Sequence, residues 1–282
     1  MVRNIANDLA AADYQAFAGV EFEFMNFETP PKDGYNALAA RRNLAAFLRD
    51  NAPATLRTLT DGMFGYSVTR PTASRDYFFD IIGRSMEFGC PLGGWHTESG
   101  PGVIEGALKV CDFVDMADRV TMFKFLARSL GTIHGVTPCF MAKPFSGLSG
   151  NSGHIHISLA DMNEQNLFAP ADPDTNAPWS DVENLSHLGR HFLAAPTVNS
   201  YKRLVENYWA PVHLSWGLED RTASIRLIAP PTCKPQAIRF EVRVPGADLH
   251  PHYTLSAFVS AGWRGVQKKL ELRIPPLTSK YP

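Results

Sequence analysis

The chain has 282 residues, of which 45% are apolar and 20% are charged, so it can bury the core of one large globular domain. Its formal net charge of −1 gives no support for a nucleic-acid or membrane-surface partner, because either would favour a strong basic excess. The N-terminal stretch lacks the apolar core of a signal peptide, and no apolar run approaches the ~20 residues of a membrane span.

Four cysteines stand at positions 90, 111, 139 and 233. They form no CxxC pair and match no zinc motif, so we interpret them as free thiols in a reducing compartment. Together with the missing signal peptide, this predicts a soluble, cytoplasmic protein.

The first half of the chain is predicted to contain one strand and three helices. Period-two alternation predicts a strand over 18–27, and Ala-, Leu- and Arg-rich composition predicts a helix over 35–51. A second helix is predicted over 75–90, ending at Gly89, and a third over 112–131, ending at Gly131. Between these two helices, residues 96–108 contain a Gly-Pro-Gly turn flanked by two polar, charged clusters.

The second half is predicted to contain three strands and one helix. Alternation predicts strands over 152–159, 223–228 and 238–244, while the Asp-, Asn- and Pro-rich stretch 160–185 is predicted to be a loop. A final helix is predicted over about 253–272. Because the strands come from distant segments with helices between them, we predict one α+β domain over 1–282, with a largely antiparallel sheet.

Three of the predicted strands carry ligand-type side chains on one face, opposite an apolar face. Glu98 and Glu105 add two carboxylates on either side of the Gly-Pro-Gly turn. The shared-face sets are Glu21 and Glu23 on the first strand, His154, His156 and Ser158 on the second, and Arg239, Glu241 and Arg243 on the last.

If these faces converge, they bring together five carboxylates and two imidazoles, which could not persist side by side without cations. Mg²⁺ and Mn²⁺ favour oxygen ligands with an occasional imidazole, and two such ions would neutralise nucleotide phosphates during phosphoryl transfer. An alternative stays open for each strand, because an antiparallel sheet often turns polar residues to water. The 239–243 strand could likewise be a surface ion-pair ladder.

Six segments resemble motifs of the glutamine synthetase family, in the order in which the family has them. GNSGHIHISL (150–159), preceded by AKP (142–144), resembles the ATP-binding signature. NSYKRLVENYWAPVHLSWG (199–217) and RTASIRL (221–227) resemble the glutamate-binding stretch, and residues 238–245 resemble the last metal-ligand strand. GVEFEFMNF and HTESGPGVIE resemble the glutamate-bearing segments. The resemblance implies a glutamine synthetase/guanido kinase type of fold, a curved sheet with helices packed on its outer side.

The resemblance also implies two divalent ions, Mg²⁺ or Mn²⁺, with ATP as a substrate. By position it assigns one ion to Glu23, Glu98 and Glu105, and the other to Glu21, His154 and Glu241. Nucleotide contacts fall on His156, Ser158, Arg226 and Arg239, and glutamate contacts fall on Gly150, Arg203 and Arg243. Arg221 matches the arginine that stabilises the transferring phosphoryl group. Bidentate recognition of carboxylate and phosphate makes arginine suited to these positions.

The implied reaction has two steps, in which the γ-carboxylate of glutamate attacks ATP and an amine then displaces phosphate from the acyl phosphate. Ammonia is the default amine. Trp209, however, stands where ammonia-using relatives carry a glutamate, and an indole cannot accept a proton from ammonium. Two alternatives therefore stay open: a γ-glutamyl ligase for a larger amine, with Trp209 in the amine site, and a non-catalytic structural or regulatory relative.

The resemblance covers the catalytic domain of the family. The sequence shows no counterpart of the N-terminal β-grasp domain, which in the family completes each active site from the neighbouring subunit of a homo-oligomer. It also has fewer residues between the HFLA and TVNSYKR elements than the family, and the family continues beyond the position of Pro282. The expectation is a domain incomplete at both ends, with one sheet edge uncovered, in a fragment, a shortened gene product or an inactive relative.

Overall fold

The computed structural model describes residues 1–30, 52, 55–169, 194–230, 232, 234–270 and 274–277. The predicted helix over 35–51 lies wholly outside the described residues, as does most of the predicted loop over 160–185. Within the described part, a nine-stranded sheet has the order β2-β3-β1-β6-β9-β8-β7, and β4 and β5 also pair with β1. The strands are β1 (Tyr14–Glu28), β2 (Leu92–Thr97), β3 (Val103–Leu108), β4 (Cys111–Asp112), β5 (Val136–Cys139), β6 (Gly153–Asp161), β7 (Trp216–Leu218), β8 (Ile225–Ile228) and β9 (Arg239–Val242).

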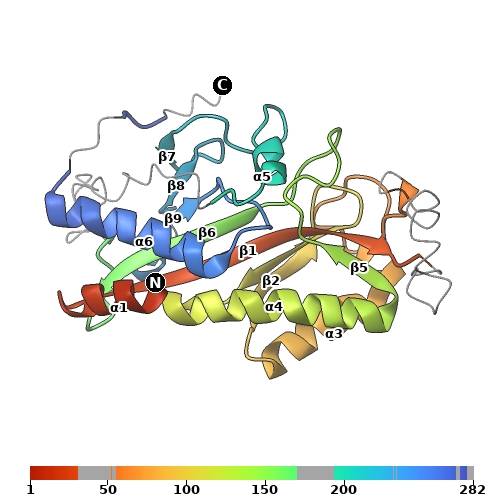
Figure 1. Ribbon diagram of the computed structural model, residues 1–282, viewed down its shortest axis with the longest axis horizontal. Coiled ribbons are helices and arrows are strands. Elements are labelled where there is room, and N and C mark those ends of the chain that lie inside the picture. The colour runs from red at the N-terminus through yellow and green to blue at the C-terminus, as the bar shows by residue number, and fades with distance from the viewer. Residues whose placement is uncertain are drawn as a thin grey trace.

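The sheet is largely antiparallel, as predicted, because β7–β8 is the only parallel pair among the strands of the described residues. Helices α1, α4 and α6 run across one of its faces, while α5 lies apart from them (Figure 1). The chain thus has the predicted α+β architecture. The helices are α1 (Val2–Ala10), α3 (Arg75–Glu87), α4 (Phe113–His134), α5 (Val198–Arg203) and α6 (Pro251–Lys268), with short 3-10 turns η2 (Arg70–Ser74) and η5 (Pro235–Ala237).

Apolar and polar side chains alternate along β1, and the apolar ones mark the face of the sheet that packs against the helices. Phe22 and Phe24 point to the helices and are fully buried. Phe24 stacks on Phe140 with ring centroids 4.6 Å apart, and it meets Phe123 of α4 edge to face at 6.1 Å. Burying one such aromatic side chain contributes about 1.5–3 kcal/mol relative to leaving it exposed. This packing fixes the orientation of β1, so that the alternating residues Glu21 and Glu23 lie on the opposite face of the sheet.

The hairpin between β2 and β3 contains the Gly-Pro-Gly turn. Gly102 has a left-handed backbone, with φ of 66°, and a Cβ there would lie 2.4 Å from the carbonyl oxygen of Asn26. Only glycine fits both conditions. The turn sets Glu98 directly after β2 and Glu105 within β3, facing the same side.

Helix α4 corrects one prediction. The sequence predicted its end at Gly131, but the helix continues to His134, and Gly135 is the residue with a left-handed φ of 67°. Gly131 lies inside the helix, where a Cβ would come 2.6 Å from the carbonyl oxygen of Val136. Its role is to let β5 pack closely on the helix. At the other end, Asp112 accepts a hydrogen bond from the Val114 N–H at 2.8 Å and caps the helix.

The other predicted boundaries shift by a few residues. The final helix begins at Pro251 and ends at Lys268 rather than spanning 253–272, and the first strand extends to Tyr14–Glu28. No helix among the described residues is long and apolar enough to cross a membrane.

Candidate active site

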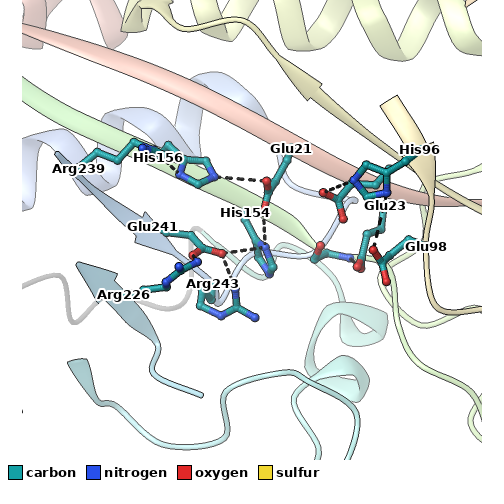
Figure 2. Close-up of polar contacts among 12 residues, drawn as sticks. Glu21, Glu23, His96, Glu98, His154, His156, Arg226, Arg239, Glu241 and Arg243 are labelled. Carbon is teal, nitrogen blue, oxygen red and sulfur yellow. Dashed lines mark hydrogen bonds and ion pairs between the residues drawn. The ribbon is translucent and has the colours of Figure 1, made fainter. Parts of the chain in front are cut away.

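The strand register lines up polar residues across the face of the sheet that lies opposite the core. Most of them line one cavity of about 1220 Å³, large enough for a nucleotide and a small acid together. Figure 2 shows the polar contacts that join these side chains. Cross-strand partners are His96 and Glu105, Glu23 and Glu105, Glu21 and His154, His156 and Glu241, and Glu241 and Arg226.

One cluster joins Glu21, His154 and Glu241, whose ligand atoms all lie within 4.8 Å of one another. The Nδ1 atom of His154 lies 2.7 Å from Glu21 Oε1 and 3.3 Å from Glu241 Oε1. His156 reaches the second oxygen of Glu21, with its Nε2 atom 3.4 Å away. These three elements, β1, β6 and β9, therefore meet at one point of the cavity.

Burial and hydrogen bonding set the charges in this cluster. Burial and the nearby Arg243 lower the pKa of His154, so its ring is neutral and holds Glu21 through an N–H donor. For Glu21, burial by itself raises the pKa, but the hydrogen bonds from His154 and His156 outweigh it and hold the pKa well below its usual value. For Glu241, burial by itself likewise raises the pKa, but nearby His154 and Arg243 outweigh burial and lower the pKa below its usual value. Both carboxylates are thus ionised at neutral pH.

A second cluster joins His96, Glu98 and Glu105, again with ligand atoms within 4.8 Å. His96 Nε2 lies 3.4 Å from Glu105 Oε1, and His96 Nδ1 lies 3.8 Å from Glu98 Oε2. Burial opposes the charged imidazole, but the hydrogen bond to Glu105 and the two neighbouring carboxylates raise the pKa of His96 to about 9. In this arrangement a protonated histidine sits between the two carboxylates.

Glu23 lines the same cavity but is not one of the three residues of that cluster. Its Oε2 atom accepts a hydrogen bond from the Ser152 N–H at 2.7 Å. Burial raises the pKa of Glu23, and the charge of Glu98 adds to this shift. The resemblance groups Glu23 with Glu98 and Glu105, and this ligand set stays a prediction; in the structure it is His96 that brings a ligand atom within 4.8 Å of both Glu98 and Glu105.

The donor set fits hard divalent cations. Burial raises the pKa of both Glu23 and Glu105, and for Glu105 the charges of Glu21 and Glu23 raise it further. Buried carboxylates that repel one another are stabilised by a cation between them. Carboxylate clusters with at most one imidazole suit Mg²⁺ or Mn²⁺ better than softer metals.

Arginines predicted to bind the substrate acid lie beside the first cluster. Arg203 is buried and donates from Nη1 to the carbonyl oxygens of Arg243 and Val244, at 3.3 and 3.1 Å. Its stem leaves no room beside Gly150, where a Cβ would lie 2.9 Å from Arg203 Cγ and 2.4 Å from the carbonyl oxygen of Ala142. Arg243 pairs with Glu241. Gly150, Arg203 and Arg243 all line the cavity.

The residues predicted to contact the nucleotide divide between the cavity and its surroundings. Arg239 Nε donates to His156 Nδ1 at 3.1 Å, and both residues line the cavity. Arg226 and the exposed Arg221 line it as well. Ser158 lies two residues beyond His156 on β6, opposite Phe17, and is not among the lining residues.

Trp209 lines the cavity with 67% of its surface exposed, next to Tyr208. Its backbone is left-handed, with φ of 56°, which is uncommon for a large aromatic residue. The ring therefore forms part of the cavity wall and is accessible from solvent.

His96 and Tyr66 lie at this site but were not predicted from the sequence. His96 carried a usable signal, because it alternates with Glu98 in HTE, as the ligand-type residues of the other strands do. Tyr66 lies on a loop without periodic pattern, and only the structure shows its ring stacked on His96 with centroids 4.1 Å apart.

Comparison with known proteins gives one consistent result. Residues 1–279 match the family model of the glutamine synthetase catalytic domain. The chain is 36% identical over 273 residues to type-1 glutamine synthetase 2 of Dictyostelium discoideum, covering 92% of this chain and 47% of that protein. It is 34% identical over 230 residues to a glutamate–isopropylamine ligase of a Pseudomonas species, covering 77% and 48%. The chain spans about half the length of these relatives.

Solved structures agree on the fold. The ADP complex of GmaS superposes with a TM-score of 0.76 at 25% identity, covering 98% of this chain and 60% of that one. Plasmodium falciparum glutamine synthetase gives 0.80 at 22% identity, covering 99% and 57%. The family match, the relatives and the fold lead to one conclusion: this chain belongs to the glutamine synthetase family.

Proposed function

We propose that the chain carries the catalytic centre of an ATP-dependent γ-glutamyl ligase, which activates glutamate as an acyl phosphate and couples it to an amine. The observation that carries this proposal is the cavity in which two carboxylate–imidazole clusters face arginines from three other segments. A site of this kind combines places for cations, phosphates and a substrate carboxylate. The relatives named above support the same class of reaction.

In this proposal the arginines divide the work. Arg203 and Arg243 hold the carboxylate groups of glutamate on the side of Glu241, while Arg239 and His156 hold the nucleotide. Arg221, exposed at the cavity, meets the charge that grows on the phosphoryl oxygens as the γ-carboxylate oxygen bonds to phosphorus. One divalent ion, when bound by Glu21, His154 and Glu241, and another, when bound by Glu23, Glu98 and Glu105, would neutralise the phosphates. The amine then attacks the acyl carbon and phosphate leaves.

The amine is proposed to be larger than ammonia. Trp209 offers an apolar face and one N–H donor but no negative charge at the cavity wall. An ammonium ion would lack its charged partner, at a cost of roughly 1–3 kcal/mol, whereas an alkylamine recovers roughly 0.5–2 kcal/mol over the indole ring. One relative is named for isopropylamine, and a Streptomyces coelicolor relative, 28% identical over 288 residues, is a gamma-glutamylethanolamide synthetase.

The test is ADP formation by the full chain with glutamate, ATP and Mn²⁺ across ammonia, ethanolamine and isopropylamine. We expect glutamate-dependent ADP release that is faster with the two larger amines and is abolished by Glu98→Ala. Release with ammonia alone would favour a glutamine synthetase in the narrow sense. Mn²⁺ binding without ADP release under any condition would favour a non-catalytic relative.

A further inference from the structure

Glu219 stands at a sharp turn directly after β7. The β7 and β8 strands run parallel, and the Glu219 N–H continues their ladder by donating to the carbonyl oxygen of Leu227 at 2.9 Å. The residue then takes a left-handed backbone, with φ of 52°, which a glutamate adopts at a cost. The turn brings its carboxylate over the neighbouring strand, to the side chain of Arg226.

Both oxygens of Glu219 are engaged there. Oε2 accepts from Arg226 Nη2 at 2.5 Å, and Oε1 accepts from the Ala229 N–H at 2.6 Å. The other arm of the guanidinium, Nη1, donates to Glu241 Oε2 at 3.1 Å. Arg226 is therefore held between two carboxylates, of which Glu241 lines the cavity and Glu219 does not.

The two carboxylates differ in what else they can do. Glu241 also meets His154 and Arg243 and belongs to a cluster fit for a cation, so its lone pairs are shared. Among the residues that the structure describes, the Glu219 carboxylate is hydrogen-bonded to Arg226 and to the Ala229 N–H alone. Glu219 therefore holds the Arg226 guanidinium from outside the cavity, and the part of the guanidinium that faces the cavity stays available to phosphate.

Resting on the function proposed above, we propose that Glu219 is a positioning residue that fixes Arg226 for phosphoryl transfer. A guanidinium held by a charge-assisted hydrogen bond does not reorient when charge grows on the phosphate oxygens. The same turn presents Arg221, because Asp220 Oδ1 accepts from both the N–H and the hydroxyl of Thr222, at 2.8 and 2.7 Å.

The first test needs no activity. In the full chain labelled with ¹⁵N-arginine, guanidinium NMR signals of Arg226 are assigned by their loss in Arg226→Lys. We expect Glu219→Gln to speed guanidinium rotation of Arg226 on the order of tenfold, since a charged hydrogen bond is lost. Glu87→Gln is the matched control, because it breaks an exposed carboxylate–arginine pair on α3, where Arg84 Nη1 lies 2.8 Å from Glu87 Oε2. Unchanged rotation in Glu219→Gln would overturn the proposal.

The second test is a double-substitution cycle on ADP formation. We expect Glu219→Gln to lower kcat about tenfold while the KM for ATP changes less than about threefold, and to add nothing in the Arg226→Lys background. Additive effects would overturn the proposal. If Glu219→Gln fails to fold, Glu219→Asn removes the charge with a residue that suits a left-handed backbone. Absence of ADP formation by the unsubstituted chain would count against the proposed ligase alone, and the NMR measurement would still decide the role of Glu219.

Discussion

At the scale of single residues, Trp209 combines three properties that belong together. It has a left-handed backbone, its ring is largely exposed, and it lines the cavity that holds both carboxylate clusters. An aromatic residue in this conformation costs on the order of 1–3 kcal/mol unless a function or the surrounding structure retains it. The apolar ring at the proposed amine site would provide that function.

Replacing Trp209 should therefore exchange the preferred amine. With Trp209→Glu, ADP formation with ammonia should rise about tenfold, because a carboxylate restores a partner for ammonium, and turnover of isopropylamine should fall. Trp209→Phe is the control, since it keeps the aromatic face and should keep the preference. If the rate with ammonia and the rate with isopropylamine are both unchanged in Trp209→Glu, Trp209 does not belong to the amine site.

Single substitutions also decide whether Glu23 or His96 joins Glu98 and Glu105 as the third ligand of an ion. His96 has a pKa of about 9, so at neutral pH it is a cation that a metal must displace, whereas Glu23 brings a carboxylate. Glu23→Ala should weaken Mn²⁺ binding at one site by at least about tenfold, and His96→Ala should leave it unchanged or strengthen it. Calorimetric titration of Mn²⁺ gives both numbers. The reverse order of the two effects would assign His96 rather than Glu23 as the ligand.

At the scale of elements, α4 is held against β5 by a glycine that helix propensity alone disfavours. Gly131→Ala would place a methyl 2.6 Å from the Val136 carbonyl oxygen, and overpacking of this kind costs typically about 1–3 kcal/mol. At Gly83, inside α3, an added Cβ would meet no described atom within 4 Å apart from its neighbours and the backbone of its own helix, so Gly83→Ala should stabilise by up to about 1 kcal/mol. Urea unfolding measures both. Equal and stabilising effects would mean that β5 does not pack on α4 as described.

Lys124 on α4 predicts how stability depends on pH. Its Nζ atom donates to the carbonyl oxygens of Ala247 and Leu249, at 2.5 and 3.1 Å, under the ring of Phe22. Burial, with a smaller contribution from nearby Arg128, lowers its pKa to about 7 in the folded chain, against 10.5 for a free lysine, and the Asp248 charge offsets this in part.

Between pH 7 and 10.5 the unfolded chain therefore binds more protons at this position, and the contribution of Lys124 to stability rises with pH, by at most about 1.4 kcal/mol per pH unit. Below pH 7 the cost is constant. Lys124→Met should flatten the profile in that window, as measured by urea unfolding at several pH values. An unchanged slope in Lys124→Met would show that the lysine stays charged throughout.

At the scale of the whole molecule, strand faces were predictable from the sequence, while the pairing of strands was not. Alternation alone placed Glu21 and Glu23 opposite Phe22 and Phe24, because side chains of a strand alternate and the phenylalanines must be buried. The segment 96–108 was predicted only as a turn, since the Gly-rich sequence LGGWHT of β2 has too few apolar residues to show a period.

The candidate site depends on contacts that no local pattern contains. His96 joins Glu105 through the register of β2 and β3, and Glu219 reaches Arg226 through a turn that brings two parallel strands together. Local sequence fixes which side chains share a face, but long-range pairing decides which faces meet. The family resemblance grouped Glu21, His154 and Glu241, whose ligand atoms the structure brings together, and it offered nothing for Glu219.

The central claim, that glutamate is activated as an acyl phosphate in this cavity, is tested most directly by oxygen transfer. Glutamate labelled with ¹⁸O in its γ-carboxylate is incubated with the full chain, ATP, Mn²⁺ and isopropylamine, and the released phosphate is analysed by mass spectrometry. Because the carboxylate oxygen bonds to phosphorus and the carbon–oxygen bond then breaks, one ¹⁸O should appear in each phosphate formed with the amide. Amide or ADP formed with unlabelled phosphate would contradict this account.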